Sequence, residues 1–532
     1  MVIIQLFIVL FLTNKVSNMT YSICYINLTM EFLYASISLC GVPLEAIREC
    51  LYMFGLSSST RLKQEIICIL YEQKDYVSSE KIVELLGYSN SQMVKKNCQE
   101  LREIANHCYL NGEVELSMVR NKGIKLTCST NNDLQKITEY IFLEDLAYNI
   151  YSDILFERFI ITTVFCKKNF VSESTLQRKV RHLNNYLHKY KLHISFSSVL
   201  KINGSEVAIR NFTFLFLFSI HRRLSGIPRL SSEQKTSCYE RTKDIEEALQ
   251  FDLIPTQREI LAVLLFVNCT AAAKNKHILF TEQQTQMIHL LSVTNKPSFL
   301  MDWTQRDWIF FLLSVYCYDF NNIRLELHSN YDALPLFVKE AELWLTLFQY
   351  SFVPLSHQNK QFVKEKLFKQ YLMQHMFYID ENLIKKSLNI DLDKIACNQP
   401  FYMQKFYEFW TSFKMNSRFF DTSQFKISSL LLCMYVIPIK DFLPKISIYF
   451  YSDLSQLHHN YLMNSVIFNF SNQYTIDYVS DIQDADLAIS TTSYLESQLS
   501  AEQDFVVIRS DLPKIDLKKL EDMFKKIVQK WL

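Results

Sequence analysis

The sequence contains very little glycine. Its 532 residues include seven glycines, about a fifth of the ~7% share that is usual, and the last of them is Gly226. Loops that hold phosphate groups through the patterns GxGxxG or GxxxxGKS/T need glycine, because the backbone itself must approach the ligand. Neither pattern occurs, so the sequence excludes a Rossmann dehydrogenase and a P-loop NTPase.

Paired cysteines and catalytic clusters are missing as well. The thirteen cysteines lie singly along the chain with no CxxC motif, a spacing that fits neither a disulfide framework nor a zinc ribbon and favours a reducing cytosol. No constellation of nucleophile, base and acid stands out. The sequence therefore predicts a cytoplasmic protein that is not an enzyme and that needs neither a metal nor a cofactor.

The chain begins with an apolar run that is shorter than a membrane span. Residues 2–12 form this run of eleven residues, which lacks the preceding basic residue and the cleavage site of a signal peptide. We expect residues 1–56 to be a dispensable apolar extension, with Met30 or Met53 as the working initiator. No membrane partner is expected.

Neither sign of charge predominates in the whole chain, but one segment is strongly basic. The net charge is +1, yet residues 167–223 contain eleven Lys or Arg against two acids, a local net charge of +9. Residues 445–532, by contrast, carry eight bases against twelve acids. A basic block within a neutral chain is typical of a surface that binds a polyanion, most often nucleic acid.

A first candidate DNA-binding unit lies upstream of the basic block. Residues 61–73 have the spacing of an amphipathic helix, and Ser78 or Ser79 can cap a short helix that ends at Gly87. Ser89 is expected to cap the next helix. A short helix, a glycine turn and a capped helix form the helix-turn-helix pattern.

Two sets of residues complete this first unit. The stripe expected to be buried in the second helix is Val94, Cys98, Leu101 and Ala105. Two short strands then follow around the turn at residues 120–123, as in a β-wing that reaches phosphates or a minor groove. The residues of this unit expected to contact DNA are Gln92, Lys95, Lys96, Arg120 and Lys122.

A second unit with the same pattern overlaps the basic block. Ser172 or Ser174 can cap a helix whose apolar positions repeat at helical spacing. The stripe expected to be buried is Leu176, Val180, Leu183 and Leu187. Arginine can bind guanine, and glutamine or asparagine can bind adenine, each through two hydrogen bonds in the major groove. The residues expected to contact DNA are Ser174, Thr175, Gln177, Arg178, Arg181, His182 and Asn185 on this helix, and Lys201 in a following wing. That wing, over residues 199–210, is predicted to turn at Asn203-Gly204.

These residues resemble a known family. The segments FVSESTLQRKVRHLNNYLHKYKLHIS and LKINGSEVAIRNF look like the second DNA-binding domain of the Mga/AtxA group of stand-alone virulence regulators of Gram-positive bacteria. The upstream unit resembles their first domain, and the resemblance extends from residue 57 to the C-terminus. It implies a transcription regulator, an activator, that works as a homodimer.

The glycine-free remainder is predicted to be helical. Over residues 230–443, amphipathic helices are interrupted at prolines, which is typical of a helical bundle. The resemblance implies two phosphotransferase-system regulatory domains (PRD-like) here, whose histidines accept phosphoryl groups from the phosphocarrier protein of the sugar-transport relay. We take His328 and His375 as the candidate phosphohistidines, although no motif around either dictates reactivity.

The last segment alternates strand and helix, so the sequence predicts a small α/β layer with a mostly parallel sheet. It resembles an enzyme IIB domain of the phosphotransferase system, in which the loop after the first strand carries a phospho-accepting cysteine. Here that loop reads Tyr451-Ser452-Asp453-Leu454, and no cysteine follows Cys433. We therefore expect contact rather than catalysis from this domain.

Taken together, the patterns predict a multidomain, mostly α-helical chain with two winged helix-turn-helix domains, two helical-bundle regulatory domains and a small α/β domain. The expected boundaries are 57–130, 131–226, 227–333, 334–440 and 441–532. The predicted function is that of a transcription regulator that binds double-stranded DNA. Two alternatives stay open: an RNA-binding antiterminator with the same regulatory domains, which the winged units disfavour, and a non-catalytic phosphotransferase-system scaffold, which does not explain the basic block.

Overall fold

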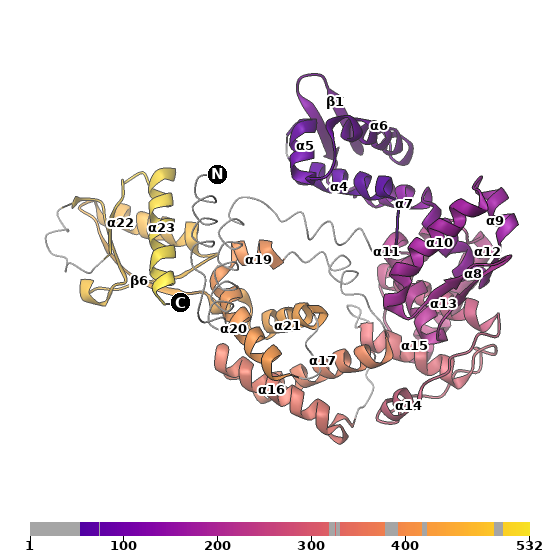
Figure 1. Cartoon of the computed structure of the whole chain (residues 1–532). Helices are drawn as coiled ribbons and strands as arrows, with labels where there is room; N and C mark the ends of the chain where they lie inside the picture. The colour runs from indigo at the N-terminus through magenta and orange to yellow at the C-terminus, as the bar shows by residue number, and fades with distance from the viewer. Residues whose placement is uncertain are drawn as a thin grey trace, which may run out of the picture.

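The computed structural model describes residues 54–531, apart from residue 74 and residues 319–324, 326–329, 378–391, 418–422 and 494–503. The chain is mostly helical, and its parts follow one another along an open arc, from an N-terminal winged unit through a long helical region to a C-terminal α/β unit (Figure 1). Among the helices described, none combines the length and the hydrophobicity of a membrane span. The apolar run at residues 2–12 and both candidate initiators lie outside the described residues.

The N-terminal unit is a winged helix-turn-helix. Its elements are α4 (Ser58–Glu72), α5 (Ser79–Leu86), α6 (Ser91–Cys108), the antiparallel strands β1 (Val114–Val119) and β2 (Gly123–Cys128), and α7 (Gln135–Leu143). The predicted apolar stripe of α6 is buried in full, and Ile137 and Ile141 of α7 pack in the same core. Because Val119 pairs with Gly123, the wing turns at residues 120–122, as predicted.

The turn between α5 and α6 differs from the prediction by one residue. Ser78 caps α5, and Gly87 ends it in the left-handed conformation with a φ of 71°. The N-cap of α6 is Asn90 rather than Ser89, because the Asn90 side chain accepts a hydrogen bond from the Met93 backbone N–H at 2.8 Å. Such a cap satisfies one of the free N–H groups of the first helical turn, and Ser89 stays within the loop.

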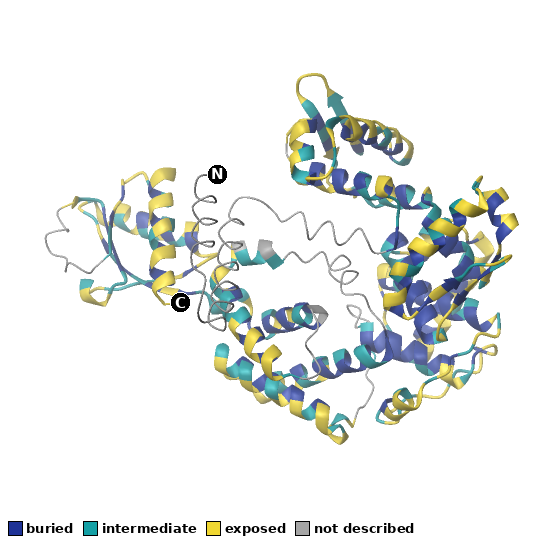
Figure 2. Cartoon of the chain, viewed as in Figure 1, coloured by how far each residue is buried: buried dark blue, intermediate teal, exposed yellow. Residues whose placement is uncertain are grey.

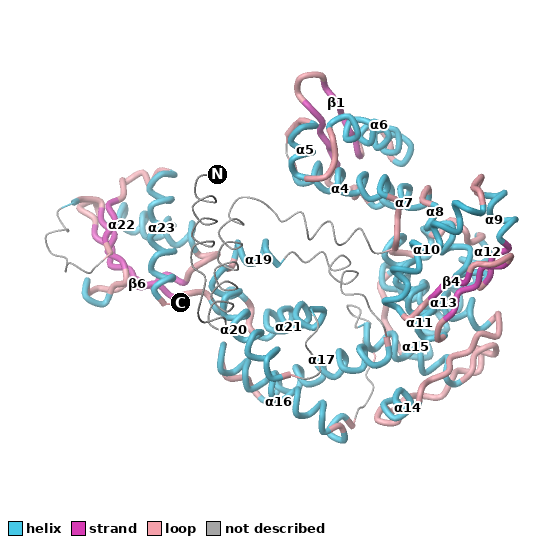
Figure 3. The backbone as a smooth tube through the Cα atoms, in the orientation of Figure 1, coloured by secondary structure: helices cyan, strands magenta, loops and turns pink. Residues whose placement is uncertain are grey.

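The second unit repeats this arrangement with a third strand. Its elements are α8 (Leu146–Glu157), β3 (Phe159–Ile161), α9 (Thr162–Lys168), α10 (Glu173–Leu187), β4 (His193–Ser195) and β5 (Val199–Asn203). The strands form an antiparallel sheet in the order β3-β5-β4; Figure 3 draws these strands in magenta beside the label β4. The predicted wing is therefore present, but its predicted turn at Asn203-Gly204 is wrong. The chain turns between β4 and β5, at residues 196–198.

A helix cap explains the misplaced turn. Ser205 is the N-cap of α11 (Glu206–His221), and its side chain accepts a hydrogen bond from the Ala208 backbone N–H at 3.2 Å. Gly204 carries the chain from β5 into this cap with a φ of 152°, and a Cβ there would lie 2.4 Å from Leu192 Cδ2. Residues 206–210, predicted as a strand, are the first turn of a helix.

Helix α11 is buried on nearly all sides. It leads into the first part of the helical region, which comprises α12 (Ser232–Leu249), α13 (Pro255–Ala272), α14 (Glu282–Ile288) and α15 (Gln305–Tyr318). Thirteen of the sixteen residues of α11 are buried. Apolar side chains from α8, α10, α11, α13 and α15 form one continuous core, seen as dark blue where these helices pack (Figure 2). The expected boundary at residue 226 therefore does not separate two cores.

A second core lies in the rest of the helical region. Its helices are α16 (Pro335–Ser351), α17 (His357–Met376), α19 (Leu392–Asn398), α20 (Pro400–Asn416) and α21 (Ser423–Val436). Helix α15 contributes to both cores, since Phe311 packs in the first and Phe310 and Leu313 pack in the second. The predicted helices are present, but the expected boundary at residue 333 cuts through a shared packing unit.

The C-terminal unit is an α/β layer with its own core. Its elements are β6 (Lys445–Tyr451), α22 (Gln456–Phe470), β7 (Thr475–Tyr478), β8 (Leu487–Ser490), β9 (Phe505–Val507) and α23 (Lys514–Lys530). The described strands pair in parallel, as predicted, and their order is β7-β6-β8-β9. The loop after β6 opens at the C-terminal edge of a central strand, where Thr491 Oγ1 donates to Asp453 Oδ1 at 2.9 Å.

Short 3-10 helices lie at His188–Tyr190, Leu224–Gly226, Tyr331–Ala333, Ile439–Phe442 and Ile482–Asp484.

A buried ion network ties α11 to the helices around it. The fully buried Arg210 donates through Nη2 to Asp307 Oδ1 at 2.6 Å and through Nη1 to Asn268 Oδ1 at 2.8 Å. Its Nε donates to Glu206 at 3.2 Å, and Glu206 also pairs with Arg158 at 2.6 Å. Two arginines thus balance two carboxylates. Because a buried charge is costly unless it is paired, we expect the network to hold α11 against α13 and α15.

Replacing Arg210 with Met should lower the free energy of unfolding by about 3 kcal/mol or more, because Asp307 would keep a buried charge without its cation. The control is Arg223→Met, at an exposed position of the same basic block, which should change that free energy by less than about 0.5 kcal/mol. Urea denaturation followed by circular dichroism measures both. Equally small effects would show that the network does not hold α11.

Candidate DNA-binding interface

Helix α10 begins at a well-formed cap. The Ser172 side chain accepts a hydrogen bond from the Thr175 backbone N–H at 3.1 Å, and Glu173 places a negative charge at the positive end of the helix dipole. The predicted stripe of Leu176, Val180, Leu183 and Leu187 is buried in full. Burial of this stripe decides which side chains of α10 point away from the core.

The opposite face of α10 is polar and exposed. Its exposed side chains include Ser174, Gln177, Arg178, Arg181 and Asn185, here called the reading stripe. Residues 174, 178, 181 and 185 share one helix face because their spacing is i, i+4, i+7 and i+11. Within the described part of the chain, no carboxylate pairs with either arginine. These side-chain types suit hydrogen bonds to base edges in a major groove.

Thr175 and His182, both predicted to contact DNA, lie on the flank of α10 that faces the first unit. Thr175 is half-buried, and its hydroxyl bonds within the helix cap. The His182 ring packs edge-on against Tyr186, with 5.1 Å between ring centroids. Burial, followed by the charges of Lys179 and Arg61, lowers the pKa of His182. His182 is exposed, and its lowered pKa favours the neutral imidazole at pH 7.

Asn184 is a residue that the sequence pattern does not single out. Its side-chain amide donates to the Ile194 carbonyl at 2.9 Å and accepts from the Ile194 N–H at 2.7 Å. It thus pairs with β4 as a neighbouring strand would, and it fixes the wing against α10. Helical spacing predicts that Asn185 is on the exposed face of α10, but only the position of β4 reveals that Asn184 is bonded to the wing.

Part of the basic block serves the fold instead of the surface. Arg210 lies in the buried network, Lys179 is bound at the junction with the first unit, and Arg222 lies over the Phe218 ring. The exposed basic residues of the block are Lys167, Lys168, Arg178, Arg181, Lys189, Lys191, Lys201 and Arg223. Apart from Arg223, they lie on α9, α10, the turn after α10 and β5, which are elements that meet DNA in a winged helix.

The first unit presents a weaker positive surface. Its predicted contact residues, Gln92, Lys95 and Lys96 on α6 and Arg120 and Lys122 in the wing turn, are all exposed. Glu80 lies nearby, and hydrogen bonds from its own backbone N–H and from Ser79 and Ser91 lower its pKa to about 2. Glu100 Oε1 lies 4.0 Å from Lys96 Nζ. These carboxylates offset part of the positive charge of α6.

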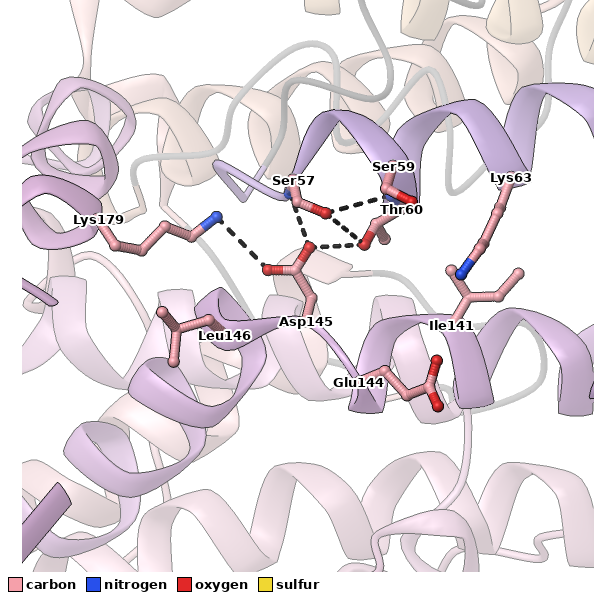
Figure 4. Close-up of a pocket in the computed structure, with 9 residues that line it drawn as sticks. All are labelled: Ser57, Ser59, Thr60, Lys63, Ile141, Glu144, Asp145, Leu146 and Lys179. Atoms are coloured by element: carbon pink, nitrogen blue, oxygen red, sulfur yellow. Dashed lines mark hydrogen bonds and ion pairs between the residues drawn. The ribbon is translucent and has the colours of Figure 1, made fainter. Parts of the chain in front are cut away.

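The two winged units meet at Asp145, the N-cap of α8, beside a pocket of about 350 Å³ (Figure 4). Its Oδ2 accepts hydrogen bonds from the Ser57 N–H and the Thr60 hydroxyl, both at 2.7 Å. Its Oδ1 accepts from the Ala147 N–H at 2.8 Å and lies 3.4 Å from Lys179 Nζ. Burial by itself raises the pKa of Asp145, but Lys179 and the hydrogen bonds outweigh it and hold the pKa below its ordinary value.

The residues just before α4 also pack on the second unit. Phe54 is buried, and its ring lies edge-on to Phe212 and Phe216, with centroid distances of 5.9 and 5.4 Å. Gly55 has a φ of 62°, and a Cβ there would lie 2.7 Å from Leu183 Cδ2. The predicted extension over residues 1–56 therefore ends too late, because its last residues belong to the packed structure.

A winged helix is typical of a DNA-binding protein when its recognition helix exposes polar side chains and basic residues lie around that helix. Residues 130–218 match the family model of the Mga helix-turn-helix domain. The match includes α8, all of α10 and the wing, and over this segment the chain is similar to Mga-like regulators. The protein is thus a DNA-binding transcriptional regulator that contains a Mga-like helix-turn-helix domain. A comparison with curated proteins finds no match.

Replacing Arg178 and Arg181 together with Ala should weaken binding to duplex DNA by at least about tenfold, because each arginine contact contributes about 1 kcal/mol or more. The control is the double change Lys514→Ala and Lys518→Ala, which removes the same charge from exposed positions of α23. It should alter the Kd less than about twofold. Fluorescence anisotropy with a labelled duplex measures both, and equal losses would exclude α10 as the recognition helix.

Proposed function

We propose that the protein regulates transcription by placing α10 in the major groove of duplex DNA, with the β4–β5 wing on the adjacent backbone. The reading stripe supports this proposal, because it lies opposite a fully buried stripe within the segment similar to the Mga helix-turn-helix domain. The first winged unit contacts the same duplex more weakly, since Glu80 and Glu100 lie among its lysines.

Two other functions are less well supported. An RNA-binding antiterminator binds through a small β-domain, whereas the exposed basic side chains here lie on a winged helix. A phosphotransferase-system scaffold has no use for an exposed basic surface around α10. We propose that the protein is cytoplasmic and is not an enzyme, since Ser452 and Asp453 occupy the loop where IIB chemistry needs a thiolate.

Binding to duplex DNA should weaken steeply with salt, because neutralised phosphates release counterions. If about six phosphates are contacted, log K falls against log salt with a slope near −5. The same sequence as duplex RNA should bind at least about tenfold more weakly, because its deep and narrow major groove does not admit a helix. Anisotropy titrations at several salt concentrations test both points. A slope near zero, or tighter binding to RNA, would contradict the proposed function.

We propose that the helical region makes the protein an activator controlled by the sugar phosphotransferase system. His328 lies outside the described residues. His375 lies in the last turn of α17, where its Nδ1 donates to the Tyr371 carbonyl at 2.9 Å, and burial lowers its pKa. A neutral imidazole is the form that accepts a phosphoryl group. Mapping of modified peptides after incubation with the phosphorylated phosphocarrier protein tests this, and an unmodified His375 would contradict it.

We also propose that the protein is a homodimer joined through α22. Leu457, Tyr461 and Phe468 follow one face of this helix and are 82, 62 and 82% exposed. Helix α22 contains no Lys, Arg, Asp or Glu, and beside it lies a groove of about 400 Å³ that reaches Leu512. Two copies of such a face can meet about a twofold axis without charge repulsion.

The double change Tyr461→Glu and Phe468→Glu should convert the dimer to a monomer at micromolar concentration, because like charges would be brought together in a desolvated interface. Leu336→Glu with Met415→Glu, at exposed apolar positions of α16 and α20, is the matched control and should leave the dimer intact. Sedimentation velocity measures both. A monomeric wild type, or a dimer that survives the α22 changes, would refute this interface.

A further inference from the structure

The two winged units are attached to the rest of the chain in different ways. The second unit shares a core with the helical region, and Glu206 joins Arg158 of the second unit to Arg210, which is bonded to α13 and α15. The first unit has a core of its own. Helix α7 of the first unit contacts α11, where the Gln135 amide donates to the Ile220 carbonyl and Glu139 Oε1 lies 3.7 Å from His221 Nδ1. The hydrogen bonds that join the start of α4 to α8 and α10 centre on Asp145 and Lys179. This junction therefore helps to set the relative position of the two units.

The junction includes the recognition helix itself. Lys179 of α10 faces Asp145 and also donates to the Gly55 carbonyl at 2.8 Å. Asp145 in turn binds the first turn of α4 through Ser57 and Thr60. The side chains of Asp145 and Lys179 are both largely buried, with 0 and 15% exposed. One carboxylate thus joins the starts of α4 and α8 to the middle of α10.

We infer that Asp145 is a positioning residue for DNA binding, which holds the first winged unit at a fixed angle to α10 so that α6 and α10 meet one duplex together. This inference rests on the proposed function. Once α10 is bound, binding of the first unit to the same duplex is intramolecular, and its strength depends on how well the held geometry matches the DNA. A loosened junction lowers the effective concentration of the first unit at the bound duplex without changing the contacts of α10.

Asparagine cannot replace Asp145 at this junction. Both oxygens of Asp145 face N–H or O–H donors, so the amide nitrogen of asparagine would face a donor, and Lys179 would lose its opposite charge. The adjacent Glu144 offers a matched control, because it is exposed and lines the same pocket. Glu144→Gln makes the same chemical change one residue away from the junction contacts.

The experiment compares a duplex of about 15 base pairs, which covers one winged unit, with one of about 40 base pairs, which covers both. We expect Asp145→Asn in the full chain to raise the Kd about tenfold on the long duplex and less than about twofold on the short one. Thr60→Val, which removes one hydrogen bond to Asp145 and no charge, should have the same effect more weakly. Glu144→Gln should change neither Kd.

Two outcomes would overturn the inference. An equal loss of affinity for both duplexes would mean that the change damages α10 itself. No loss of affinity for the long duplex would mean that the junction does not influence DNA binding. A wild-type chain that binds neither duplex would refute the proposed function instead. Thermal unfolding of each variant is measured in parallel. If Asp145→Asn is unfolded at the assay temperature, the ratio of the two Kd values for Thr60→Val decides the question.

Discussion

The buried side chain of Arg210 joins the DNA-binding half of this protein to its helical half. Arg210 lies on α11 and is bonded to Asn268 on α13 and to Asp307 on α15. In a poorly polarisable interior such a charge is stable only when its partners are all in place. These contacts favour one position of α11, and the second winged unit is coupled to it, since β5 leads into this helix.

This constraint divides the basic block into two functional groups. Arg210 and Lys179 stabilise the fold through Asp307 and Asp145, whereas the arginines of the reading stripe remain exposed. A local net charge of +9 thus overstates the positive charge available to phosphates. The charge still marks the segment that overlaps the Mga helix-turn-helix match, because eight of its eleven basic residues are exposed.

The shared core also limits how a signal in the helical region can reach DNA. Because the second winged unit and the first helices of that region pack as one body, α10 cannot rotate by itself without exposing apolar side chains to water. In the dimer that we propose, a signal can move this body as a whole through subunit association, or it can alter the junction of the body with the first unit. The same packing explains why the core does not divide at residue 226.

Local sequence patterns alone determined α4, α5, α6 and α10, a cap at Ser172 or Ser174 and the buried stripe of α10, because caps and helical spacing involve residues within a few turns of one another. They also determined the parallel C-terminal sheet and the basic segment. Tertiary structure decided which polar residues remain available to DNA. The partner of Arg210 lies 97 residues away, and the roles of Lys179 and Asn184 depend on Asp145 and β4. At Asn203-Gly204 a turn signal competes with a helix cap, and the burial of α11 in the common core favours the cap.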